Sequence, residues 1–171
     1  MKDYFVANIS TIEKNYYDIV NQCNLIKNNY DGDLTKNYHQ YNIFSLTSGS
    51  VYFYDIYKFL NKFVREKLNK PNERMWFQAW LNYHKESEVL DWHSHEWDYH
   101  GYISIDPKNT ITEFENYSID NKVGQIYFGP GYRKHRVKVN SSYDDYRITI
   151  GFDVTLDSMM DTNCFGMFPL L

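Results

Sequence analysis

The sequence predicts a mainly β (α+β) fold, a double-stranded β-helix or jelly roll with two N-terminal packing helices. Apolar residues follow a helical period up to about residue 70 and a period of two from Arg74 onward. The 171 residues include 17 Tyr, 11 Phe and 4 Trp, side chains that suit half-buried β surfaces. We expect a single domain over 1–171, with helical support at 1–70, the β core at 74–154 and an apolar tail at 155–171.

Composition excludes several classes of function. The net charge is −4 and the basic residues are dispersed, so the sequence lacks the electrostatic footprint of a nucleic-acid-binding protein. No apolar run approaches the roughly 18 residues that span a bilayer, and the N-terminus does not match a signal peptide. Cys23 and Cys164 are too few for a disulfide framework. We therefore expect a cytoplasmic protein without membrane or nucleic-acid partners.

The first predicted helix begins near Ser10, which with Glu13 matches a capping box. Apolar residues then recur at helical spacing over 12–26, until the turn residues of 28–32 end the pattern. A second helix is predicted over 51–68. Two such helices can cover one face of a β structure.

Short segments of alternating polarity follow, separated by Asp, Asn, Gly and Pro residues. The predicted strands are 74–84, 89–93, 99–105, 111–117, 123–128, 135–140 and 145–154. Seven short strands after two helices are typical of a jelly roll. Because the tail carries Met159, Met160 and Phe165, we expect it to dock on the body or on a second copy in a homodimer.

Three histidines have the spacing of a metal site. In Trp92-His93-Ser94-His95, residues two apart share one face of an extended segment, so His93 and His95 can point into one cavity. After Gly124-(x5)-Pro130-Gly131, His135 alternates with valines on an inward face. Neutral imidazoles are good ligands for iron, copper, nickel or zinc. We predict a metal bound by these three histidines, although an inward histidine is also a common satisfied core residue.

Other polar residues near the pair leave alternatives open. His100 is a candidate fourth ligand or substrate contact, whereas His84 and His39 suit structural or surface positions. Glu96 and Asp98 are candidates for a carboxylate ligand, or are solvated loop charges. The third ligand is therefore His95 or one of these carboxylates.

An arginine follows the last histidine in Arg147-Ile148-Thr149. Alternation puts Arg147 and Thr149 on one face, and a buried guanidinium is best matched by a bidentate carboxylate. These two residues therefore predict an anchor for an anionic co-substrate. The alternative is an internal ion pair with Asp144, Asp145 or Asp153.

Over roughly 75–154, the sequence resembles the iron(II)- and 2-oxoglutarate-dependent oxygenases, and most of all a group of small oxygenases of phages and marine bacteria. The resemblance is carried by Trp76-Phe77-Gln78-Ala79-Trp80-Leu81-Asn82-Tyr83, His93-Ser94-His95, Tyr99-His100-Gly101-Tyr102-Ile103, the turn from Gly124 to His135, and Arg147-Ile148-Thr149. It implies Fe(II) as cofactor, with 2-oxoglutarate and O2 as co-substrates. His135 would bind the metal, and Arg147 with Thr149 would hold the far carboxylate. The sequence departs from the family at His95, where most members carry Asp or Glu.

The resemblance predicts a dioxygenase that hydroxylates a substrate which the sequence does not identify. We expect Trp80, Tyr83, His100, Tyr102 and Tyr127 to wall the substrate pocket. Two other functions remain open. The His-x-His and Gly-(x5)-Pro spacing also resembles cupin-type metalloenzymes or metal-binding proteins without 2-oxoglutarate, and the aromatic content suits a non-enzymatic jelly-roll interaction protein.

Overall fold

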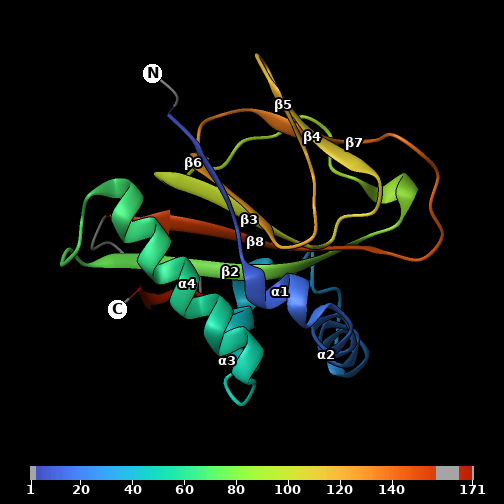
Figure 1. The fold of residues 1–171 in the computed structure, drawn as a ribbon, viewed down its shortest axis with the longest axis horizontal. Helices are drawn as coiled ribbons and strands as arrows, with labels where there is room; N and C mark the ends of the chain where they lie inside the picture. The colour runs from blue at the N-terminus through green and yellow to red at the C-terminus, as the bar shows by residue number, and fades with distance from the viewer. Residues whose placement is uncertain (1–2, 157–165, 171) are drawn as a thin grey trace.

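The computed structural model describes residues 3–156 and 166–170. In these residues, antiparallel strands form two sheets that face each other (Figure 1). The larger sheet has the order β1 (Phe5–Asn8), β6 (Gln125–Pro130), β3 (Tyr99–Asp106), β8 (Arg147–Thr155), β2 (Met75–His84) and β9 (Phe168–Leu170). The smaller sheet has the order β5 (Ser118–Asp120), β4 (Thr110–Phe114) and β7 (His135–Val139).

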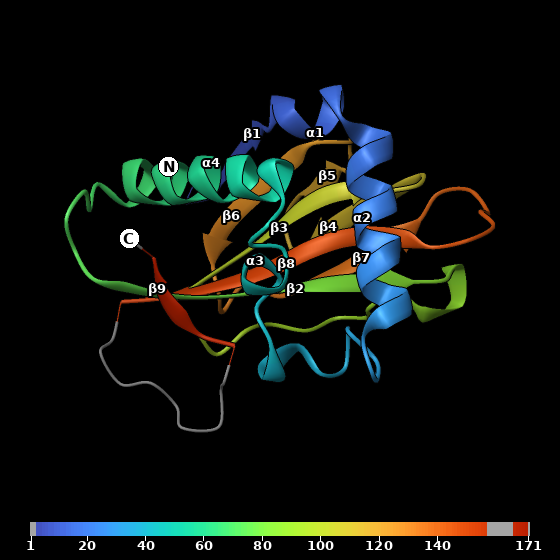
Figure 2. The ribbon, with the colours of Figure 1, turned by 90° about the horizontal axis from the view of Figure 1, so that it is seen from below.

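Helices cover the face of the larger sheet that points away from the smaller one (Figures 1 and 2). They are α1 (Ser10–Lys14), α2 (Tyr16–Asn29), α3 (Ile43–Leu46) and α4 (Val51–Leu68). Two short 3-10 turns, η1 (Tyr38–Gln40) and η2 (Glu86–Glu88), lie in the connections before α3 and after β2. The structure therefore has the predicted architecture of N-terminal helices on a β-sandwich.

The predicted helix at 51–68 is confirmed with the same bounds. Its N-terminus is capped by the side chain of Ser50, which accepts a hydrogen bond from the backbone N–H of Phe53. Its C-terminus ends at Asn69, which adopts the left-handed conformation with φ 53°. The buried residues of α4 are Phe53, Ile56, Leu60, Phe63 and Val64, so one helix face packs on the sheet.

The first predicted helix differs in detail. It is interrupted at Asn15, which separates α1 from α2. The expected capping box at Ser10 is wrong, because Ser10 is already the first helical residue and Ile9 at the N-cap offers no polar side chain. The end of α2 at Asn29 agrees with the predicted turn at 28–32.

Two of the predicted strands are wrong, one because it is not a strand and one in its extent. Segment 89–93 is not a strand, since only His93 forms an isolated bridge, to His135. Segment 111–117 contains a turn that separates β4 from β5. Strands β1 and β9 are not predicted from the sequence, because they are only four and three residues long and carry too few residues to show a period of two.

Side-chain alternation divides the larger sheet into two unlike faces. Toward the helices, buried residues of β2, β3, β6 and β8 join one apolar core: Phe77, Ala79, Leu81, Ile103, Ile126, Phe128, Ile148, Ile150, Phe152 and Val154. The residues between them are largely polar and also buried: Gln78, Asn82, His84, His100, Ser104, Arg147, Thr149 and Asp153. The helix side therefore supplies most of the apolar burial, and the polar face lies between the sheets.

Part of the apolar tail docks on the body as predicted, because β9 pairs with β2 from Met75↔Leu170 to Phe77↔Phe168. Met159, Met160 and Phe165 lie outside the described residues. None of the described helices is both long enough and apolar enough to cross a bilayer.

Substitution of Gly101 in β3 by alanine is expected to disturb packing. A Cβ at this position would lie 2.1 Å from Cζ of Phe152 and 2.5 Å from the backbone oxygen of Tyr127. Because the backbone cannot yield cheaply, Gly101→Ala should lower the free energy of unfolding by about 1–3 kcal/mol or more. Gly49→Ala is the matched control, since a Cβ there meets nothing within 4 Å. Equal urea midpoints for the two variants would contradict the predicted clash.

Candidate metal centre

The segment that follows η2 brings two histidines against β7. The backbone N–H of His93 donates to the carbonyl of His135 at 3.0 Å, and the N–H of His135 donates back at 2.9 Å. The N–H of His95 donates to the carbonyl of Gly131 at 2.9 Å. A Cβ at Gly131 would lie 2.0 Å from the carbonyl oxygen of Trp97, so this close approach requires glycine. The Gly-(x3)-His spacing thus fixes the loop that carries the pair.

The three imidazoles predicted to bind a metal converge. His93, His95 and His135 each offer a ligand atom, and these atoms lie within 4.8 Å of one another. Nδ1 of His93 lies 2.7 Å from the carbonyl oxygen of Asp91, and Nδ1 of His135 lies 3.1 Å from that of Arg133. Because a carbonyl only accepts, both Nδ1 atoms carry the proton and both Nε2 atoms keep a lone pair. Histidines that bind metals commonly donate their other N–H in this way.

A second group of possible ligands shares His95. The ligand atoms of His95, His100 and Asp153 also lie within 4.8 Å of one another. One carboxylate oxygen of Asp153 lies 3.0 Å from Nδ1 of both histidines, and the two rings stack with centroids 3.6 Å apart. Nε2 of His95 is buried and has no hydrogen-bond partner. The arrangement can therefore hold a metal through three histidines or through two histidines and a carboxylate.

Burial keeps these donors in the forms that bind metals. Desolvation, with the neighbouring imidazoles of His100 and His93, lowers the pKa of His135 to about 2. Desolvation and the imidazole of His95 lower the pKa of His100 to about 4. Burial alone would raise the pKa of Asp153, but the hydrogen bonds from His100 and His95 outweigh it and lower that pKa. At neutral pH, His135 and His100 are therefore neutral and Asp153 is ionised.

One cavity, with a volume of about 50 Å³, is lined by the imidazoles of His93, His95, His100 and His135 and by Arg147. Only 3% of Arg147 is exposed, and its Nε donates to Oγ1 of Thr110 at 3.4 Å. Desolvation lowers its pKa to about 10, which leaves it charged at neutral pH. Within residues 3–156 and 166–170, no carboxylate pairs with it, so the alternative of an ion pair with Asp144, Asp145 or Asp153 is wrong. Its positive charge faces the cavity without an acidic partner.

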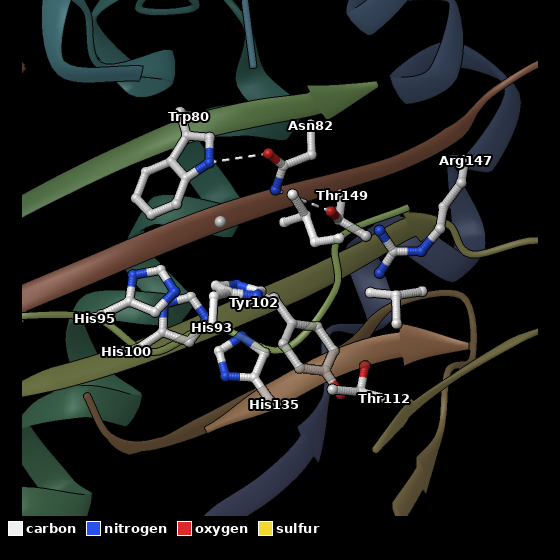
Figure 3. A pocket seen from close by; sticks show the side chains of 13 residues that line it. Trp80, Asn82, His93, His95, His100, Tyr102, Thr112, His135, Arg147 and Thr149 are labelled. Atoms are coloured by element: carbon white, nitrogen blue, oxygen red, sulfur yellow. Dashed lines mark hydrogen bonds between the residues drawn. The ribbon is translucent and has the colours of Figure 1, made fainter. Parts of the chain in front are cut away.

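Figure 3 shows the imidazoles at one end of the cavity and the guanidinium of Arg147 at the other. Between them, Nε1 of Trp80 donates to Oδ1 of Asn82 at 3.0 Å, and Nδ2 of Asn82 donates to Oγ1 of Thr149 at 3.3 Å. Because Thr149 accepts from Asn82, its own hydroxyl proton remains available to a ligand. The cavity thus combines lone pairs at one end with hydrogen-bond donors and a positive charge at the other.

Three of the five residues expected to wall the pocket line this cavity, namely Trp80, His100 and Tyr102. The expectation is wrong for Tyr83, because alternation gives the inner face to Asn82 and turns Tyr83 to the helix side, where its hydroxyl donates to Asn24 at 3.4 Å. It is also wrong for Tyr127, which stacks behind Tyr102 with ring centroids 5.4 Å apart.

The carboxylates considered in the sequence analysis point elsewhere. Glu96 and Asp98 are exposed, and Asp98 accepts hydrogen bonds from Oγ1 of Thr155 and the N–H of Leu156 at 2.9 and 2.8 Å. Asp153 is the carboxylate near the imidazoles. The sequence does indicate where this carboxylate points, because alternation along β8 places Asp153 on the same face as Arg147. The sequence prediction included Asp153 only as an ion-pair partner for that arginine.

No family model and no curated protein sequence matches this chain. Among solved structures, the chain is similar to SnoN, a non-heme α-ketoglutarate-dependent epimerase from nogalamycin biosynthesis, with a TM-score of 0.59 and 7% identity over 90% of this chain and 76% of SnoN. It is also similar to the non-heme monooxygenase ThoJ in a nickel complex, with a TM-score of 0.59 and 10% identity over 99% of this chain and 76% of ThoJ. At these identities the similarities show a shared double-stranded β-helix fold.

His84 predicts a pH dependence of stability. It lies opposite Arg147 in the register of β2 and β8, is 4% exposed, and its Nδ1 has no partner. Desolvation, followed by the charge of Arg147, lowers its pKa from 6.5 to about 4. As the pH falls, the unfolded chain binds a proton at this histidine near pH 6.5, whereas the folded protein binds it only near pH 4. The free energy of unfolding is therefore unaffected by the titration of His84 above pH 6.5 and falls by roughly 3 kcal/mol as the pH is lowered to about 4.

His84→Gln should therefore flatten the dependence of the unfolding free energy on pH in this range, as measured by urea denaturation of the metal-free protein. His39→Gln, at an exposed position of η1, should leave the wild-type slope unchanged. Parallel slopes for the wild type and His84→Gln would contradict the prediction.

Proposed function

We propose that this protein is an iron(II)- and 2-oxoglutarate-dependent dioxygenase. His93, His95 and His135 would hold the iron, and Arg147 with Thr149 would bind the far carboxylate of 2-oxoglutarate. One observation carries the proposal: a buried guanidinium without an acidic partner faces the same small cavity as three convergent imidazoles. The substrate that is oxidised is left unspecified.

The guanidinium of Arg147 supports a carboxylate ligand. A buried charge without a partner is strongly unfavourable, and removal from water is offset only by an opposite charge with good hydrogen bonds. A carboxylate can accept two parallel N–H bonds from one guanidinium. Thr149 lies on the same face and offers its hydroxyl proton, because Asn82 already donates to its oxygen. These donors therefore suit an anion better than a neutral group.

The imidazole end supports a metal. His93 and His135 are fixed with Nε2 unprotonated by their bonds to backbone carbonyls, and the buried Nε2 of His95 has no partner in the protein. When bound, iron(II) supplies a Lewis acid that can accept a keto acid and activate O2. The protein's own contribution is to orient the keto acid from Arg147 and to exclude water with Trp80 and the two apolar residues that line the cavity, Leu90 and Val137. The name of SnoN, an α-ketoglutarate-dependent enzyme of the same fold, supports this co-substrate.

A second candidate is a cupin-type metalloenzyme that uses no 2-oxoglutarate. Neither Glu96 nor Asp98 belongs to a candidate metal group, so the proposed site has three neutral histidine ligands. Non-heme iron(II) oxygenases usually bind the metal through two histidines and a carboxylate, and this difference favours the second candidate. In this case Arg147 would hold the carboxylate of the substrate itself. Anaerobic titration of the iron(II) protein with 2-oxoglutarate separates the two, because chelation by the keto acid produces a visible charge-transfer band only in the first.

His135→Gln should weaken the binding of Mn(II), used as an oxygen-stable probe for iron(II), by more than about 100-fold, beyond the effect expected for a residue outside the ligand set. The reason is the loss of one of three converging lone pairs. His39→Gln, in an exposed position, is the matched control and should bind as the wild type does. Isothermal titration calorimetry measures both, and unchanged affinity in His135→Gln would reject the three-histidine site.

Arg147→Met should weaken 2-oxoglutarate binding by roughly 100-fold or more, because a buried charged hydrogen bond is lost, and leave Mn(II) affinity unchanged. The ligand-free variant should be as stable as the wild type, or more stable by roughly 1 kcal/mol, since an unpaired buried charge is removed. Arg136→Met is the control, because Arg136 pairs with Glu113 at 2.7 Å outside the cavity. Wild-type co-substrate affinity in Arg147→Met would contradict the anchor.

A further inference from the structure

Asp153 is the most deeply buried carboxylate near the candidate metal centre, with 1% of the residue exposed. It lies on β8, on the same face as Arg147 and Thr149. In the described residues, the side chains that its carboxylate contacts are the imidazoles of His95 and His100. A carboxylate removed from water needs such partners, because an isolated buried charge is strongly disfavoured.

The hydrogen bonds define the protonation of both imidazoles. Oδ1 of Asp153 lies 3.0 Å from Nδ1 of His95 and 3.0 Å from Nδ1 of His100. The other oxygen, Oδ2, lies 3.3 Å from Nδ1 of His95. An ionised carboxylate only accepts hydrogen bonds, so Nδ1 of each ring carries a proton. In the neutral form of such a ring, Nε2 keeps its lone pair.

At the two other proposed ligands, the Nδ1 proton is held by a backbone carbonyl instead of a carboxylate. Backbone carbonyls of Asp91 and Arg133 accept from Nδ1 of His93 and His135. Of the three proposed ligands, only His95 has a side-chain carboxylate behind it. A carboxylate in that position orients the ring and makes the imidazole a more basic ligand. It also brings a negative charge close to a set of neutral donors.

We propose that Asp153 is a positioning residue: its carboxylate holds the proton of His95 on Nδ1, so that Nε2 of His95 is free to bind the metal. This inference rests on the proposed function and adds an acidic residue that lies behind the ligands. Direct coordination by Asp153 is the competing arrangement. It would compete with the hydrogen bonds that the carboxylate accepts from the rings of His95 and His100.

The tautomer is measured on the wild-type protein without metal, at about pH 8, by nitrogen-15 NMR of labelled histidine. We expect His95 and His100 to be protonated on Nδ1 and unprotonated on Nε2, with assignments from His95→Gln and His100→Gln. A proton on Nε2 of His95 overturns the proposal. This measurement does not require a folded Asp153 variant.

The effect on the metal is measured with Asp153→Asn, which keeps the shape of the side chain and removes the charge. Mn(II) affinity should fall by about 10- to 100-fold, while the visible spectrum of the Co(II) form keeps the band positions of the wild type. Asp106→Asn is the matched control, because Asp106 pairs with Lys108 at the far end of β3. It should bind Mn(II) as the wild type does.

Two outcomes overturn the positioning role while the wild type still binds metal. Unchanged affinity in Asp153→Asn means that the carboxylate does not act on the site, and a changed Co(II) spectrum means that Asp153 is itself a ligand. A wild-type protein that binds no metal removes the proposed function and this inference together. If the wild type binds metal but no 2-oxoglutarate, only the proposed function fails.

Discussion

The register between β2, β8 and β3 decides which side chains meet in the cavity, because successive residues of a strand point to opposite faces of the sheet. A slip by one residue would move every polar side chain of this face into the apolar core under the helices. The observed pairing instead places three transverse rows on the inner face: Gln78, Asp153 and His100; Trp80, Gly151 and Tyr102; Asn82, Thr149 and Ser104. Gly151 completes the second row because a Cβ there would lie 2.6 Å from the indole of Trp80.

Charge is separated along β8, and therefore across the rows. The guanidinium of Arg147 lies at one end and the carboxylate of Asp153 at the other. In the described residues Arg147 pairs with no carboxylate, and Asp153 contacts the imidazoles of His95 and His100. In a medium of low polarity, such a separation of charge is unfavourable in the empty protein. A bound cation near Asp153 and a bound anion near Arg147 would each relieve it. The carboxylate of Asp153 lies behind the ring of His95, 3.0 Å from its Nδ1.

The parts of the site that could be predicted from the sequence are those with a local signal. A period of two along 145–154 places Arg147 and Thr149 on one face. The glycine four residues before His135 is also a local signal, because a Cβ at Gly131 would clash with the backbone of Trp97. The double-stranded β-helix followed from the change of period near residue 74. Tyr83 shows the limit of the method, because a fully buried strand such as β2 is buried on both faces and its residue types do not tell which face looks into the cavity.

The remaining features depend on contacts between distant segments. Asp153 meets His95 and His100 only after β8 pairs with β3, so no spacing in the sequence announces the contact. The same holds for β1 and β9, which add to the edges of the larger sheet by pairing with β6 and β2. Segment 89–93 was predicted as a strand from its local pattern, but a strand also needs a paired neighbour. This segment lies along β7 and forms a bridge at His93 alone.

The division of the larger sheet into two faces also explains how the fold tolerates an unfavourable cavity. Burial of apolar area is the main stabilising term in folding, and here it is concentrated between the sheet and the helices. The opposite face holds buried polar atoms without partners, among them Nδ1 of His84, Oη of Tyr102 and Oγ of Ser104, each of which lowers stability. A single sheet thus carries a stabilising apolar face and a polar face, part of which lines the cavity. Substitutions on the two faces should therefore separate, with stability affected mainly on the first and binding mainly on the second.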